Sequence, residues 1–131
     1  MKPVAVDTNV LARLATGDDA REHRAVVEAL ATRPWRVFLT VILETEWMLR
    51  SRYGYAPRQF ADFVEWMNGS GRIHLEQART ACKAVAYHRA GMDFADALHN
   101  IAQADGEPFL TLDKALRRKA DKLNLSALPP G

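Results

Sequence analysis

The chain has very little cysteine, because Cys82 is the single one among its 131 residues. One cysteine can form neither an intramolecular disulfide nor a cysteine-based metal cluster. Cys82 lies in a stretch with helical spacing, so we expect a small core residue rather than a nucleophile. The function therefore has to be sought among other residue types.

Long hydrophobic runs, internal repeats and low-complexity segments are also missing. No apolar run approaches the ~20 residues that a membrane helix needs. Asp7 interrupts the apolar start of the chain, so we expect no signal peptide, no membrane partner and a cytoplasmic location. Length and the lack of a linker predict a single domain over residues 1–131.

Three further absences narrow the chemistry. The formal net charge of +2 is too small to identify a nucleic-acid partner by itself. The seven glycines lie in separate turns, so there is no glycine-rich phosphate loop. The four histidines lack the spacing of a zinc site.

Predicted strands alternate with predicted helices along the whole chain. Short apolar runs predict strands at residues 3–6, 35–39, 72–75 and 109–112, with an edge strand at 125–128. Helical spacing and turn residues predict helices at about 10–15, 19–33, 41–52, 57–67, 76–90, from 93 to near 104–106, and 114–122. Thr40 is the expected cap of the third helix. This order favours an α/β fold with a mostly parallel sheet flanked by helices.

Four acidic residues stand where this fold should bring them together. Asp7 and Asp113 follow predicted strands, Glu44 lies one turn into a helix, and Asp96 lies in a first helical turn. The carboxyl ends of parallel strands meet at one edge of a sheet, so we expect one edge of one sheet to gather all four. Crowded carboxylates repel, and a divalent cation such as Mg²⁺ or Mn²⁺ relieves that repulsion.

Each acid also has a purely structural interpretation. Asp7, Asp93 and Asp113 are well placed as helix N-caps, and for any one of them the cap is the simpler interpretation. Asp96 then lies favourably near a positive helix end. Glu46 is expected to face solvent or to support the site. The metal hypothesis gains weight because four acids follow the same geometry.

With these motifs in place, the chain resembles PIN-domain ribonucleases of the VapC toxin type. The matching segments are residues 6–11, 41–50, 93–98 and 111–113, in the right order along the whole chain. The resemblance implies a Rossmann-like, three-layer α/β/α sandwich and Mg²⁺- or Mn²⁺-dependent cleavage of RNA.

The resemblance also implies which residues form the site. The family's first acid corresponds to Asp7, its third to Asp96, and a fourth, more variable one to Asp113. Its helix glutamate corresponds to Glu44 rather than Glu46, because Trp47 follows three residues later as in the family pattern. Further residues implied at the site are Thr8, Asn9 and Thr111 as polar support, and Asp93 as a water-mediated or outer contact.

The same resemblance implies partners. Proteins of this type form homodimers, often cleave transfer RNA, and are inhibited by a VapB-type antitoxin whose tail lies on an apolar helical surface. Candidates for that surface are Val10, Leu11, Leu14, Trp47, Met48, Phe60, Phe63 and Trp66. Candidates for phosphate contacts are Arg13, Arg50, Arg52, Arg117 and Arg118.

Two rival functions stay open. An aspartyl phosphatase would use Asp7 as nucleophile, but Asn9 stands where such enzymes have a second acid. A non-catalytic PIN-like module that only binds protein or RNA would be expected to have lost acids, whereas all four are retained here.

Overall fold

The computed structural model describes residues 1–101 and 106–131. The helices are α1 (Thr8–Thr16), α2 (Ala20–Thr32), α3 (Leu39–Tyr53), α4 (Pro57–Gly69), α5 (Ala78–Arg89), α6 (Phe94–His99) and α7 (Lys114–Lys122). The strands are β1 (Val4–Ala5), β2 (Trp35–Val37), β3 (Ile73–Leu75), β4 (Phe109–Leu110) and β5 (Ala127–Leu128). The predicted order of elements is confirmed. The predicted end of the sixth helix near residues 104–106 falls largely outside the described residues.

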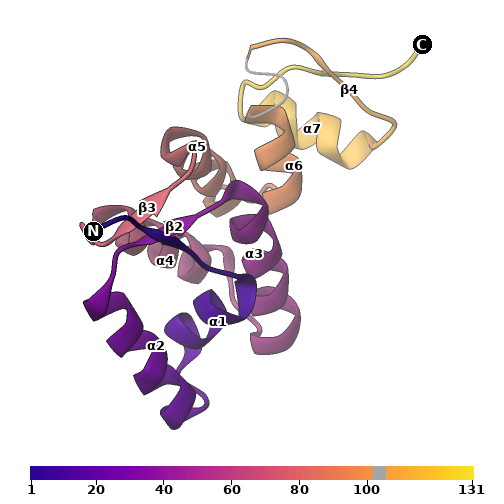
Figure 1. Ribbon diagram of the computed structural model, residues 1–131. Coiled ribbons are helices and arrows are strands. Elements are labelled where there is room, and N and C mark those ends of the chain that lie inside the picture. Colours follow the sequence, from indigo (N-terminus) through magenta and orange to yellow (C-terminus); the bar gives the residue numbers. More distant parts are fainter. Residues whose placement is uncertain (102–105) are drawn as a thin grey trace.

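The first sheet contains β1, β2 and β3 in that order, and all its pairs are parallel. Trp35 of β2 is the register partner of both Val4 and Ile73. Trp35 and Val37 of this central strand are buried. Helices α4 and α5 both contact β3, while α1 packs on α2 and α3 (Figure 1). The predicted α/β sandwich with parallel strands is therefore confirmed.

Strand β4 does not join this sheet, so the expectation of one sheet holding all the acid-bearing strands is wrong. Among the described strands it pairs in parallel with β5 alone, with Phe109 opposite Ala127. Figure 1 shows β4 and α7 at one end of the molecule, beyond α6. The N–H groups of Phe109 and Thr111 bond the carbonyls of Ser126 and Leu128, which are joined to β4 by one short helix. Pairing across such a short connection closes a small loop and loses little chain entropy.

Helix α3 begins one residue earlier than its expected cap. Phe38 occupies the N-cap with no side-chain cap bond, and its carbonyl accepts from the N–H groups of Val41 and Ile42. The predicted cap at Thr40 is therefore wrong. Thr40 instead lines a groove on the surface of α3.

The core fixes α6 against α5. Phe94, at the start of α6, is fully buried and meets Phe60 edge-to-face with ring centroids 5.0 Å apart. The His88 ring of α5 also meets the Phe94 ring edge-to-face, with ring centroids 5.7 Å apart. These contacts set the position of Asp96, in the first turn of α6. Across the described ranges, no helix is long and apolar enough to cross a membrane.

Candidate active site

The first pair of acids joins α1 to α3. Asp7 is the N-cap of α1, and its carboxylate accepts the N–H of Val10 at 3.2 Å. The next residue, Thr8, is buried and donates its hydroxyl to Glu44 on α3. The chain therefore places the Glu44 carboxylate beside the turn that carries Asp7, although 36 residues separate Thr8 from Glu44.

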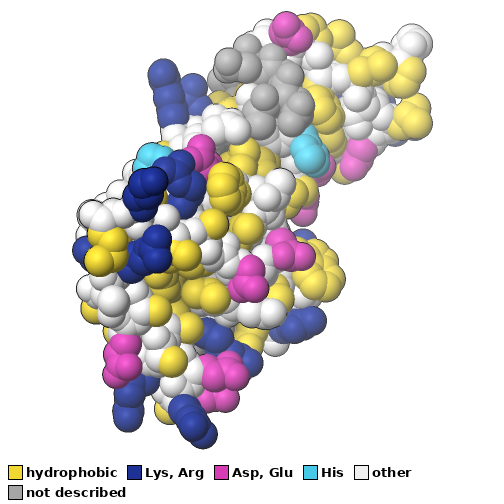
Figure 2. Space-filling view, in the orientation of Figure 1, with side chains coloured by type: hydrophobic (Ala, Val, Ile, Leu, Met, Phe, Trp, Pro, Cys, Tyr) yellow, Lys and Arg dark blue, Asp and Glu magenta, His cyan; other side chains and the backbone are white. Residues whose placement is uncertain are grey.

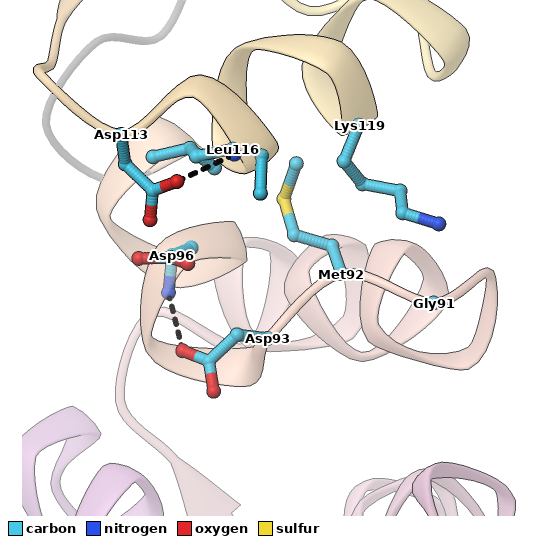
Figure 3. A pocket seen from close by; sticks show the side chains of 8 residues that line it. Gly91, Met92, Asp93, Asp96, Asp113, Leu116 and Lys119 are labelled. Carbon is cyan, nitrogen blue, oxygen red and sulfur yellow. Dashed lines mark hydrogen bonds between the residues drawn. The ribbon is translucent and has the colours of Figure 1, made fainter.

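A second group of acids lines one pocket of about 190 Å³ between α6 and α7. Asp93 caps α6 through the N–H of Asp96 at 3.2 Å, and Asp113 caps α7 through the N–H of Leu116 at 3.0 Å. Figure 3 shows the Asp113 carboxylate directed toward Asp96, with Lys119 at the far side of the pocket. The side chains that cap these two helices therefore also line the pocket.

Electrostatics in this pocket act against ionised Asp96. Burial raises the pKa of the Asp96 carboxyl above its ordinary value, and the negative charges of Asp93 and Asp113 raise it further. Like charges that share a site raise a carboxyl pKa, and a cation bound among them reverses the effect. This pocket would therefore gain from a bound cation.

The two groups of acids are neighbours, because Glu44 and Ala95 line the same groove between α3 and α6. They do not form one cluster. Within residues 1–101 and 106–131 no set of three or more Asp, Glu, His or Cys side chains is placed to hold one metal ion. The oxygen-only donors fit a hard divalent cation in chemistry. Their arrangement here is two adjoining groups rather than a single shell of four.

Glu46 does not face solvent, so the first of its two expected roles is wrong. Its side chain is only 4% exposed and accepts from Nε of Arg50 at 2.9 Å. His88 approaches the same carboxylate oxygen to 4.0 Å. Glu46 is therefore committed to neighbouring side chains, which supports Glu44 as the acid available to a ligand.

The residues expected at the antitoxin surface differ in their solvent exposure, and one of the expected phosphate-binding arginines is already paired. Leu11 and Phe60, two members of the expected antitoxin surface, are core residues, whereas Trp47 and Trp66 are 53% and 51% exposed. Among the arginines, Arg13 is paired with Asp18 and Glu22.

Sequence reasoning missed the roles of His88 and of the Glu46–Arg50 pair. The i, i+4 spacing of Glu46 and Arg50 was a usable signal for the ion pair. No local pattern indicated that His88, on α5, would lie beside the Glu46 carboxylate.

Comparison with known proteins identifies the class. Residues 4–122 match the PIN domain family, and the chain therefore belongs to that family. PIN domains are generally metal-dependent nucleases. No curated protein and no solved structure matches the chain.

Proposed function

We propose that this protein is a metal-dependent endoribonuclease that hydrolyses RNA phosphodiester bonds. We further propose that it acts in the cytoplasm as the toxin of a VapBC-type toxin–antitoxin pair, with transfer RNA as a candidate target. Family membership supports the nuclease class. The observation that carries the proposal is the shared pocket of Asp93, Asp96 and Asp113, next to the Glu44 groove.

In this proposal Asp7, Glu44 and Asp96 would hold Mg²⁺ or Mn²⁺, and Asp113 would add a contact. When bound, the cation supplies a Lewis acid that activates water and neutralises phosphate charge. The chain's own groups orient these ligands. One oxygen each of Asp7 and Asp113 accepts a backbone N–H, which leaves the other oxygen for a ligand. The Thr8 side-chain hydroxyl donates to one oxygen of Glu44 and leaves the other for a ligand. The products would carry a 5′-phosphate and a 3′-hydroxyl.

Loss of any one ligand should remove most of the activity. Asp7→Asn, Glu44→Gln and Asp96→Asn are each expected to slow cleavage by about 100-fold or more, because a metal-activated nucleophile and its charge neutralisation are lost together. The measurement is cleavage of structured RNA in Mg²⁺ or Mn²⁺, with a chelator expected to stop it and added metal to restore it.

The matched control is Glu28→Gln, which removes an exposed acid from α2, away from both groups. It should cleave like the wild type. Unchanged cleavage by Asp7→Asn would remove the role proposed for that acid.

The proposed partners are a VapB-type antitoxin and a second copy of the chain. Exposed apolar side chains support both. Trp66 stacks on Phe63 along α4, with ring centroids 6.2 Å apart, and offers an apolar surface to an antitoxin tail. A short open reading frame directly upstream, encoding a protein that blocks toxicity on co-expression, would support the toxin role. A chain that is harmless on expression without any such neighbour would contradict it.

A further inference from the structure

A groove of about 420 Å³ runs along one face of α3 and is closed on its far side by Ala95 of α6. Thr40, Leu43, Glu44 and Trp47 line it at intervals of three and four residues, which is the spacing of one helical face. One of the proposed metal ligands, Glu44, therefore forms part of its wall. Figure 2 shows acidic and hydrophobic side chains next to one another over α3.

Trp47 leaves more than half of its surface in solvent at this groove. Trp35, by contrast, is 1% exposed in the core. Exposing a large aromatic ring forfeits the hydrophobic stabilisation that burial would provide. An indole face beside a site for phosphodiester chemistry is a platform on which any nucleobase can stack.

Arg50 supplies the positive charge of the groove. Its Nε is bonded to Glu46, yet the side chain is 48% exposed. In the described part of the chain no hydrogen bond uses its two terminal nitrogens. Those nitrogens form the planar fork that binds phosphate oxygens.

Two buried side chains, Glu46 and His88, orient Arg50. Glu46 is fixed between Arg50 and His88, and Nδ1 of His88 lies 2.7 Å from the carbonyl oxygen of Met92. Met92 directly precedes Asp93, so this chain of contacts links the guanidinium to the turn that carries the second group of acids. The negative charge of Asp93 also contributes to raising the pKa of Arg50, after the larger effect of Glu46.

We propose that this groove is the subsite for the nucleotide next to the scissile phosphate of single-stranded RNA. Trp47 stacks on its base and Arg50 binds its phosphate, while Glu46 acts as the positioning residue for Arg50. This inference rests on the proposed nuclease function. RNA is favoured over a peptide because an aromatic face, a guanidinium and Glu44, a proposed metal ligand, occur together in one groove.

The test separates RNA binding from cleavage. A fluorescein-labelled single-stranded RNA decamer is titrated in chelator, and binding is followed by anisotropy. Trp47→Ala is expected to weaken binding by about ten-fold, since base–aromatic stacking contributes on that order. Trp47→Phe keeps an aromatic face and should retain most of the affinity. Trp66→Ala, which removes an equally exposed indole from α4, should bind like the wild type.

Arg50 has its own readout. Arg50→Ala should lower the slope of log affinity against log salt by about 0.7, as expected for one lost phosphate contact on a single strand. Glu46→Gln keeps an acceptor for Nε but loses the charge, and should weaken RNA binding less than Arg50→Ala. Thermal melts check that each variant is folded.

Equal RNA affinity of Trp47→Ala and wild type, with cleavage intact, would overturn the subsite while leaving the nuclease function in place. RNA that binds through Trp47 but is never cut in Mg²⁺ or Mn²⁺ would refute the hydrolysis and leave the subsite standing. A groove that takes an antitoxin peptide and no RNA would overturn the subsite and leave the proposed nuclease function in place.

Discussion

At the scale of single residues, Asp96 shows how a carboxylate can be useful and unfavourable at once. It lies half-buried with Asp93 and Asp113 around it, and both burial and their charges raise its pKa. A carboxyl whose pKa is raised on folding stabilises the fold while protonated. That contribution is lost as pH rises through the raised pKa, above the ordinary value of 3.8. At neutral pH the ionised group therefore works against folding.

Removing this charge should stabilise the protein when no metal is present. Asp96→Asn is expected to raise the melting temperature in chelator at pH 7 and to lose that advantage in acid, where the wild-type carboxyl is protonated. The measurement is thermal unfolding by circular dichroism across pH. Glu28→Gln, at an exposed acid, should show no such pH-dependent gain; an equal gain there would contradict the account.

At the scale of elements, the acids also decide where helices begin. Asp7, Asp93 and Asp113 each accept a backbone N–H in the first turn of α1, α6 and α7. An N-cap satisfies a donor that has no partner inside the helix. Two of these three caps, Asp93 and Asp113, also line the pocket between α6 and α7. A ligand held by its own helix in this way needs little reorganisation on binding.

Two substitutions at Asp113 separate the cap from the charge. Asp113→Ala should destabilise α7 by about 1 kcal/mol, because the N-cap is lost, whereas Asp113→Asn keeps a capping oxygen and should leave stability near that of the wild type. Both should reduce cleavage if the carboxylate contacts the cation. The free energy of unfolding from urea titration, measured beside activity, distinguishes the two roles. Equal stability of the two variants would mean that the cap contributes nothing.

At the scale of the whole molecule, the separate β4–β5 sheet leaves apolar surface in solvent. Leu110, Leu112 and Leu128 are 67%, 82% and 47% exposed, and hydrophobic side chains gather over this end of the molecule (Figure 2). Small sheets with unpaired edges are marginally stable on their own and favour pairing with another chain. This surface supports the proposed homodimer.

A charge on this surface should therefore disturb association. Leu112→Arg is expected to shift the proposed dimer toward monomer, because a guanidinium would replace the most exposed leucine side chain of that surface. Light scattering coupled to size exclusion measures the mass. Val27→Arg, at an exposed apolar position on α2, is the control and should leave the mass unchanged. A wild-type chain that is monomeric at all concentrations would refute the dimer.

Local sequence determined the order of strands and helices and the identity of the candidate acids. Apolar spacing marks α2 and α4, and capping aspartates mark the starts of α1, α6 and α7, because these signals act between residues close in the chain. Only the tertiary structure decided that β4 pairs with β5 instead of joining the first sheet, that the acids form two adjoining groups, and that Glu46 is buried against Arg50 and His88. Strand partners and burial depend on contacts between residues far apart in sequence, and no local periodicity encodes them.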